Sequence, residues 1–268
     1  MIVCADDFGL APDINRAIVE LAEAGRVTAV SVMASLPAVT REDLRPLLGL
    51  DAKVDVGLHL TLTPDRGAMP ARKSTLSPKG QFVSYGFLVL RCMRGLAKPA
   101  DCAAEITAQY NLFVEKTGRI PDFIDGHKHV HQLAGIREGL LMFVRTLPKD
   151  ARPYVRNTGA SLMEIARLRA SFIKQYLISK PGGVLRDMLT AEGVLTNDGF
   201  AGVYDYKRYE RYPEYLRRFA QRLSLRPNGL LMTHPGLDEP WRRAEYEGVK
   251  DADYFGRPTR FIRHRGAR

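Results

Sequence analysis

Apolar blocks alternate with amphipathic stretches along this chain, and the first block already combines a strand with candidate chemistry. Ile2 to Ala5 is a short apolar run that leads into Asp6 and Asp7 and then into Phe8 and Gly9. An apolar run before a turn is typical of a buried strand in a parallel sheet. Because ligands of parallel α/β folds bind at the carboxyl ends of strands, the two aspartates are candidate site residues.

The aspartate pair has two interpretations at this point. Two adjacent carboxylates repel each other, and their burial without partners is costly, so a bound cation would stabilise them. Alternatively, Asp6 or Asp7 is the N-cap of the following helix, and its carboxylate accepts hydrogen bonds from the first turn.

The same alternation continues to the last third of the chain. Amphipathic patterns predict helices at 14–23 (closed by Gly25), 41–50, 82–96, 100–117, 136–147, 160–176 and 212–223. Apolar or β-branched runs predict strands at 28–34, 54–62, 121–125, 153–156 and 229–233. We expect Pro181 to Gly183 to end the basic helix and 197–202 to be a turn, and the sequence leaves open whether the residues beyond Pro240 are ordered. The rhythm of strand and helix predicts a parallel α/β sheet in a single domain, 1–268, and an α/β barrel fits this length.

One connection differs from the others. Residues 64–81 are rich in Pro, Gly, Ser and Lys and show no periodicity. The segment is too long for a routine connection, and loops over the carboxyl ends of strands often cover substrates. We therefore expect a lid at 64–81 and a frayed basic tail at 263–268.

Composition limits the class of protein. The chain has 268 residues, of which 45% are hydrophobic, and no apolar run is long enough to span a membrane. No charged-then-apolar leader opens it, so we expect a cytoplasmic protein. Its cysteines, Cys4, Cys92 and Cys102, are scattered and form no CxxC pair, which argues against a disulfide framework.

The net charge of +10 does not by itself indicate a protein that binds nucleic acid. Lys and Arg concentrate at 167–180, 208–226 and 257–268, and no nucleic-acid-binding motif accompanies them. We expect solvated helix faces and a loose tail, with no nucleic acid as a partner. The sequence leaves a homodimer open.

Polar residues at the predicted strand ends form a candidate metal site. Five of the six histidines belong to this set, which is hard to explain as scattered core residues. The set comprises Asp6, Asp7, His59, His127, His129, His131, Arg156 and His234. Histidine and carboxylate ligands without cysteine suit Zn, Mn, Fe, Co or Ni, and suit Mg less well. Three protein ligands and an open position would make a hydrolytic site.

The conformation of the HKHVH segment and the role of Arg156 each have two interpretations. On a helix, His127 and His131 would share a face, whereas in an extended chain His127, His129 and His131 would share one. Whether His131 replaces or joins His127 as a ligand is open. Arg156 binds a substrate hydroxyl or carboxylate, or it forms a surface ion pair.

Four motifs in order resemble the YdjC/ChbG family of carbohydrate deacetylases, to which the hopanoid-associated HpnK proteins belong. They are ADDFG after the first strand, GLHLTLT at the third, DGHKHVH after the fourth and THPG near the end. The resemblance covers Met1 to about Gly236. Where the family segment reads like DSHQHVH, this chain has Gly126 and Lys128, which affects the contacts to substrate.

The resemblance implies a fold and a site. It implies a distorted (β/α) barrel similar to polysaccharide deacetylases, with one divalent metal ion, Mg or Zn, at its carboxyl face. It maps the metal ligands onto Asp7, His59 and His127, the general base onto Asp6 and a late acid onto His234. Lys128, His129, His131 and Arg156 are then candidates for binding substrate.

The implied reaction is hydrolysis of the N-acetyl group of an amino sugar, on an oligosaccharide or a glycolipid. A base activates water, the metal stabilises the oxyanion, and an acid protonates the leaving amine. Two alternatives remain: a metal-dependent phosphoesterase, for which Lys128 would supply an extra cation, and a non-enzymatic basic binding module.

Overall fold

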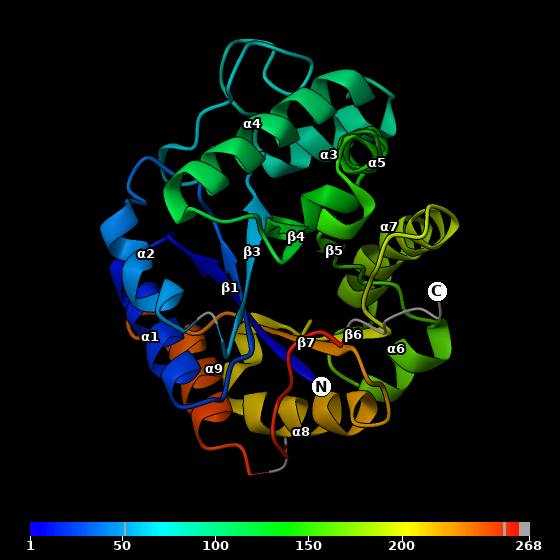
Figure 1. Ribbon diagram of the computed structural model, residues 1–268. Coiled ribbons are helices and arrows are strands. Elements are labelled where there is room, and N and C mark those ends of the chain that lie inside the picture. The colour runs from blue at the N-terminus through cyan, green and yellow to red at the C-terminus, as the bar shows by residue number, and fades with distance from the viewer. Residues whose placement is uncertain (51, 254–255, 263–268) are drawn as a thin grey trace.

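Seven parallel strands form one curled sheet in the computed structural model, which describes residues 1–50, 52–253 and 256–262 (Figure 1). The strands are β1 (Ile2–Phe8), β2 (Ala29–Val32), β3 (Asp55–Leu60), β4 (Phe123–Gly126), β5 (Tyr154–Val155), β6 (Gly199–Ala201) and β7 (Gly229–Thr233). Their order in the sheet is β5-β4-β3-β2-β1-β7-β6, so β1 lies inside the sheet, between β2 and β7. The predicted tail at 263–268 lies outside the described residues.

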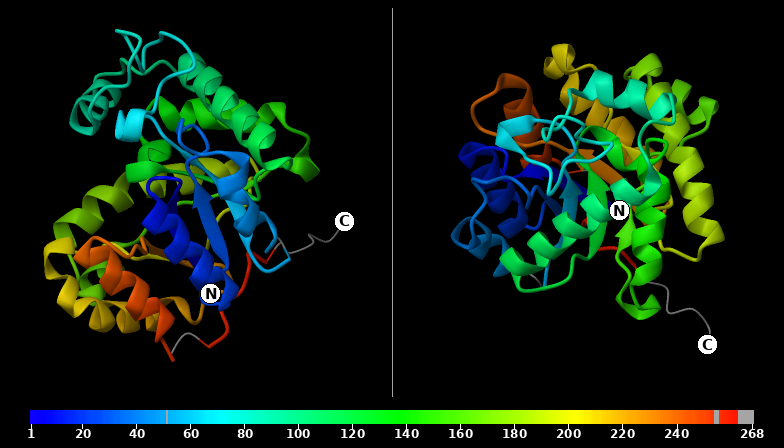
Figure 2. Two further views of the ribbon diagram at one scale, coloured as in Figure 1. Left: turned by 90° about the vertical axis from the view of Figure 1, so that its left-hand side faces the viewer. Right: turned by 90° about the horizontal axis from the view of Figure 1, so that it is seen from above.

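Helices surround the outer face of this sheet (Figures 1 and 2). They are α1 (Pro12–Glu23), α2 (Arg41–Leu48), α3 (Tyr85–Met93), α4 (Pro99–Thr117), α5 (Ile136–Thr146), α6 (Leu162–Leu168), α7 (Phe172–Ala191), α8 (Tyr212–Leu223) and α9 (Pro240–Lys250). Short 3₁₀ turns lie at η1 (Asp65–Gly67), η2 (His127–Gln132), η3 (Lys149–Ala151) and η4 (Tyr206–Arg211). No helix among the described residues has the length and apolar character needed to cross a bilayer.

The two edges of the sheet approach each other, which makes the fold a distorted (β/α) barrel. β5 and β6 are the edge strands, and Val155 of β5 forms a parallel bridge with Thr196, three residues before β6. The N–H of Val155 also donates to the carbonyl of Leu195 at 2.9 Å. The predicted single-domain α/β barrel is therefore confirmed.

Alternation along the strands separates an inner core from an outer one. Ile2 and Cys4 of β1 belong to a small apolar cluster with residues of the other strands, including Phe123, Tyr154 and Leu230. Val3 and Ala5 belong instead to the large core that also contains the apolar faces of the helices. Even positions of β1 thus face the barrel interior, which matters for the aspartates that follow.

Two expectations about the second half of the chain are wrong. Pro181 does not end a helix but lies inside α7. Because proline has no N–H, it cannot donate a hydrogen bond to the carbonyl of Leu177. The next carbonyl, that of Ile178, accepts hydrogen bonds from the side chains of Gln132 and Thr158, each at 2.9 Å. The predicted turn at 197–202 contains strand β6. The stretch after Pro240, which the sequence left open, forms the amphipathic helix α9.

The long connection at 64–81 packs against a neighbouring helix. Apart from η1 it has no regular structure, as the sequence predicts. The Ala71 and Thr75 N–H groups donate to Glu105 and Asp101 of α4, at 2.9 and 3.0 Å. These bonds fasten most of the segment to α4, and only its first turn, at Asp65, reaches the barrel mouth.

Candidate active site

A bulge in β1 turns Asp7 toward the barrel mouth, next to the inward-facing Asp6. The register of β1 against β2 shifts between Ala5 and Phe8, and Asp7 has φ 73°, a value uncommon for any residue except glycine. Regular alternation would direct Asp6 inward and Asp7 outward, and the shifted register changes this. The helix-cap interpretation is wrong, because α1 has Ala11 at its N-cap and no side-chain capping bond.

Asp7, His59 and His127 form a compact buried triad. Asp7 Oδ1 lies 2.9 Å from His127 Nδ1 and 3.4 Å from His59 Nε2. One ligand atom from each of the three side chains lies within 4.8 Å of the others. His59 is placed by the end of β3, and His127 by the turn after β4. The three strand ends thus bring together the residues that the sequence predicted as metal ligands.

Further polar groups fix the orientation of the triad. His59 Nδ1 lies 2.6 Å from Asp125 Oδ1 and 2.7 Å from Ser31 Oγ. On the other side, Arg242 Nη2 donates to Asp7 Oδ2 at 2.7 Å, which leaves Oδ1 toward the histidines. Asp65 Oδ2 lies 3.7 Å from His127 Nε2. Carboxylates behind ligand histidines are common in metal sites, where they set the tautomer.

The charges of the triad are strongly coupled. Burial opposes the ionised form of Asp7, but the charge of His127 and hydrogen bonds from both histidines hold the pKa of Asp7 well below its usual value. Burial likewise opposes the imidazolium of His59, but Asp125 and Asp7 outweigh it and raise the pKa of His59 to about 10. The pKa of His127 is also raised, because Asp7 and Asp65 overcome its burial. The charges of Asp7 and of the His59 imidazolium therefore stabilise each other, and a cation bound by the triad would compete with that proton.

This donor set fits a divalent metal ion. One carboxylate oxygen and two imidazole nitrogens face a common point, and their outer atoms already have partners. Mixed nitrogen and oxygen ligands suit zinc-like ions better than magnesium, which prefers oxygen. Asp7, His59 and His127 could hold such an ion with a position left open for water.

Asp6 lies in a second, deeper network. Both oxygens of its carboxylate accept from Arg156, each at 2.6 Å, and Arg156 Nη2 also lies 2.7 Å from Asp125 Oδ2. Arg156 is completely buried and is not among the residues that line the cavity, so its predicted surface ion pair is wrong. The arginine instead forms a buried bridge between Asp6 and the carboxylate that supports His59.

The HKHVH segment is neither a regular helix nor a strand. It forms η2, with Lys128 and His129 at left-handed φ values of 54° and 58°. As a result the three histidines diverge. His127 joins the triad, and His129 lines the cavity beside Phe200. His131 is fully buried, 3.0 Å from the carbonyl of Arg156, and burial lowers its pKa to about 4.

Lys128 and His234 both line the cavity, and each has an acidic partner. Lys128 Nζ pairs with Asp65, at 2.7 and 2.9 Å from its two oxygens. His234 follows β7, and its N–H donates to Glu245 Oε2 at 2.6 Å. The His234 ring stands edge-on to Tyr206 and Trp241, each at 5.9 Å.

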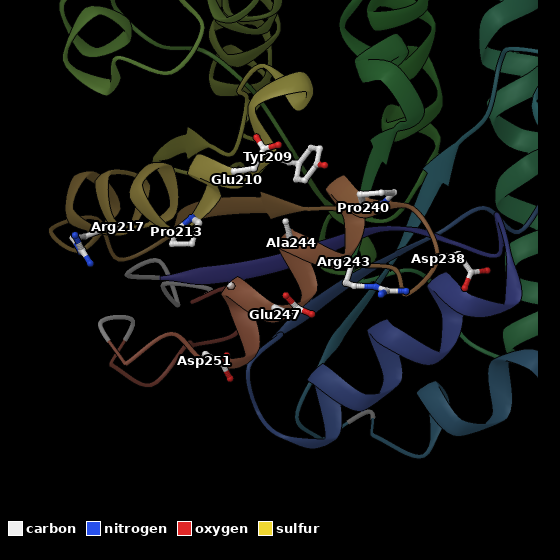
Figure 3. Close-up of a pocket in the computed structure, with 11 residues that line it drawn as sticks. Tyr209, Glu210, Pro213, Arg217, Asp238, Pro240, Arg243, Ala244, Glu247 and Asp251 are labelled. Carbon is white, nitrogen blue, oxygen red and sulfur yellow. The ribbon is translucent and has the colours of Figure 1, made fainter.

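A cavity of about 300 Å³ connects these groups. Its lining includes Asp6, Asp7, His59, His127, His129 and His234, together with Tyr85, Lys174, Tyr206, Trp241 and Arg242. A larger hollow of about 720 Å³ lies between η4, α8 and α9 (Figure 3), but its mixed acidic and basic lining contains none of the predicted site residues. We therefore place the site in the smaller cavity.

Sequence reasoning missed several members of this site. Asp125, Ser31 and Asp65 support the histidines, while Arg242 and Glu245 come from α9, which was not predicted. In α9, buried Arg242 and Glu245 lie on the same face as Tyr246 and Val249. Charged residues on the apolar face of an amphipathic pattern are the signal that could have identified them.

Comparisons with known proteins agree with this geometry. A family model described as YdjC-like protein matches residues 1–259. A carbohydrate deacetylase from Mus musculus is 31% identical over 252 residues, which cover 88% of this chain and 77% of the mouse protein. A chitooligosaccharide deacetylase from Yersinia enterocolitica is 34% identical over 136 residues, about half of each protein. The crystal structure of a candidate cellobiose-phosphate cleavage protein from Enterococcus faecalis has the same fold, with a TM-score of 0.66, 19% identity, and coverage of 95% of this chain and 91% of that one.

Proposed function

Because the chain belongs to the YdjC-like family, we propose that it is a metal-dependent hydrolase that removes the N-acetyl group from an N-acetylated amino sugar. The observation that carries this proposal is the triad of Asp7, His59 and His127 in the wall of a cavity that Asp6 and His234 also line. The names of the similar mouse and Yersinia proteins support the same reaction class.

The triad would hold one divalent ion, zinc or magnesium. When bound, such an ion polarises a carbonyl and acidifies water. Arg242 occupies one oxygen of Asp7, so the carboxylate would offer only its other oxygen to the ion. Asp125 holds His59 so that Nε2 faces the same point. The chain thus supplies oriented ligands and leaves room for substrate on the cavity side.

Asp6 and His234 would move the protons. Asp6 is held by two bonds from Arg156, which fix its carboxylate at the cavity wall, and it would accept a proton from the attacking water. The leaving amine needs a proton, and His234 lines the same cavity with its backbone held by Glu245. Arg156 acts as a positioning residue for Asp6.

Aromatic and polar side chains would bind the sugar. Tyr206 and Trp241 lie with ring centroids 4.5 Å apart beside His234, and both line the cavity, where they would contact a pyranose. Lys128 and His129 also line the cavity and remain candidates for contacts to hydroxyl groups. His131 does not line it; like Arg156, it would act only through other residues.

The decisive experiment combines metal analysis with acetate release. Purified protein should contain about one divalent ion per chain and release acetate from N-acetylated amino sugars. Trp241 is the only tryptophan of the chain and lies in the cavity, so its fluorescence can follow metal titrations without turnover. Protein that binds no metal, or that releases no acetate when loaded with metal, would refute the proposal.

The two aspartates provide a matched pair of variants. Asp6→Asn should bind metal nearly as the parent does but release acetate at least ~100-fold more slowly, the usual scale for losing a general base. Asp7→Asn should bind metal weakly, and excess metal should partly restore its rate. The opposite pattern would exchange the two roles.

The competing functions lose part of their support. Lys128 favoured a phosphoesterase as an extra cation, but its charge is paired with Asp65. A release assay on matched phosphate and acetyl substrates separates the two reactions. A non-enzymatic basic binding module should lose its partner when residues 263–268 are removed and the basic residues at 167–180 are replaced. Binding that survives both changes would argue against it.

The segment 64–81 remains a proposed lid of restricted extent. Asp65 is its part closest to the triad, whereas none of 64–81 is among the residues that line the cavity. Shortening the segment beyond η1 should raise KM or lower kcat if it closes over the substrate. Unchanged kinetics would make it part of the α4 surface.

A further inference from the structure

The first half of α7 exposes its apolar residues and buries its polar ones. Gln175 and Ser179 are buried, and Gln175 Nε2 donates to the carbonyl of Val203 at 3.1 Å. On the outer side, Ile173 is 73% exposed and Leu177 is 65% exposed, and Phe172, Tyr176 and Val184 are exposed as well. A helix with this inverted pattern presents an apolar stripe to its surroundings.

Helix α3 shows a second exposed apolar surface. Its buried residues are Leu88 and Cys92, while Phe87, Leu90 and Met93 are exposed, Met93 at 79%. The candidate active-site cavity connects the two helices, because Tyr85 of α3 and Ile178 of α7 both line it. Helices α3 and α7 (labelled in Figure 1), which carry these exposed apolar residues, therefore both reach the cavity.

Positive charge is concentrated on the same two segments. Residues 66–98 contain seven Lys and Arg, residues 165–186 contain five, and neither range contains Asp or Glu. Since the net charge of the whole chain is +10, the rest of the chain carries −2. Ten of the twelve basic residues are exposed, although Arg72 and Arg186 also pair with neighbouring Asp101 and Asp187. The surplus positive charge of the protein thus lies on the two sequence segments that contain α3 and the first half of α7.

We propose that the exposed faces of α3 and α7 form a docking surface for an anionic phospholipid membrane, with the barrel mouth directed at the lipid headgroups. Exposed Phe, Ile, Leu and Met side chains enter the boundary between headgroups and acyl chains, and the surrounding Lys and Arg contact anionic headgroups. This is the composition of interfacial helices, which lie on a membrane without crossing it. The proposal does not depend on the reaction catalysed.

Charge complementarity favours a membrane over the other partners of an apolar surface. In a symmetric dimer through this face, the basic segments of both copies would come together without acidic residues of their own to pair with. Nucleic acid would neutralise the positive charge, but contacts to phosphate would not bury the exposed apolar side chains of Ile173, Leu177 and Met93. Anionic lipid satisfies both the apolar and the charged component.

Vesicle flotation tests the proposal with defined lipids. The full-length protein should float with vesicles of phosphatidylcholine and phosphatidylglycerol at low salt, and poorly with phosphatidylcholine alone. Ile173→Ser with Leu177→Ser should weaken partitioning at least ~10-fold, since two interfacial apolar side chains are lost. Lys180→Glu should weaken partitioning by about tenfold because it removes electrostatic attraction to the anionic lipid, and high salt should remove most of this difference.

Matched controls come from the opposite end of the barrel. Leu225, 91% exposed before β7, and Lys149, exposed before β5, lie at the amino ends of strands, so Leu225→Ser and Lys149→Glu should float as the parent does. All five substitutions are at exposed positions, so melting temperatures should stay near that of the parent. Equal loss in the control variants, no flotation with anionic vesicles, or salt-sensitive RNA binding that the apolar variants leave unchanged would each overturn the proposal. It would also be overturned by a stable dimer that becomes monomeric in the Ile173→Ser/Leu177→Ser variant and does not bind vesicles.

Discussion

Arg156 is the side chain whose removal should destabilise the barrel interior most. It is completely buried and pairs with Asp6 and Asp125, each of which is at most 2% exposed. Arg156→Met removes one partner and leaves two carboxylates buried without it. Breaking a buried ion pair in this way costs about 3–5 kcal/mol. For a chain of this size that corresponds to a fall in melting temperature of about 6–20 °C.

The assay is urea unfolding of metal-free protein at two pH values. The Arg156 charge and the His59 contacts overcome burial and hold the pKa of Asp125 below its usual range. Its contribution to stability is therefore present above about pH 4 in the parent and is lost only as pH falls through that lowered pKa. In Arg156→Met, the uncompensated Asp125 carboxylate should take up a proton more readily, so the deficit relative to the parent should shrink from pH 8 to pH 5.

Two further variants separate charge from packing. Arg156→Lys keeps the charge but cannot bridge two carboxylates with a rigid fork, so its stability should lie between those of the parent and Arg156→Met. Arg145→Met removes an exposed pair with Glu192 and should show no resolvable loss. A change of less than about 1 kcal/mol in Arg156→Met at pH 8 would refute the reasoning, because it would mean that the buried carboxylates need no counter-charge.

Three other predictions test the surroundings of the triad. In metal-free protein the pKa of His59 is about 10, above its ordinary value of 6.5, so the contribution of His59 to stability is complete below pH 6.5 and is lost as the pH rises toward 10. Urea unfolding should show this decline in the parent. An equal decline in His59→Gln would contradict the prediction. Asp65→Asn should weaken metal binding by about 10-fold or more through His127, by fluorescence titration, and unchanged affinity would remove Asp65 from the site. Gly182→Val should unfold at a clearly lower temperature than the parent, because a Cβ at Gly182 would lie 2.2 Å from Thr158 Oγ1; a melting temperature equal to that of the parent would show that α7 can shift.

Local pattern predicted most strands and the polar residues at their ends, because both depend on short-range order, and the resemblance to the YdjC/ChbG family selected Asp7, His59 and His127 from that set. β1, β3 and β7 are apolar runs, and residues at the ends of parallel strands must meet at one edge of the sheet. Asp7, His59 and His127 therefore came together as expected. The same reasoning could not determine how HKHVH runs, because two residues with left-handed φ values interrupt any regular period.

Long-range contacts were beyond the reach of the sequence pattern. Arg242 donates a hydrogen bond to Asp7, which is 235 residues away in the sequence, and Arg156 donates to Asp6, which is 150 residues away. A local periodic pattern contains no signal for either contact. The predicted helix end at Pro181 was wrong for a related reason. Pro181 normally ends a helix, but bonds from Gln132 and Thr158 to the neighbouring carbonyl of Ile178 help to hold this one together.

The strained backbone of Asp7 explains why two adjacent aspartates can have different environments. A regular strand would place one carboxylate inside the barrel and the other among the helices. The bulge after Ala5 and the φ of 73° at Asp7 let Asp6 reach Arg156 in the interior while Asp7 meets His59, His127 and Arg242 at the mouth. A left-handed residue other than glycine costs free energy, and glycine at this position would relieve that strain. Glycine would also remove the only carboxylate of the triad, so the strain is the consequence of having a ligand side chain at this turn.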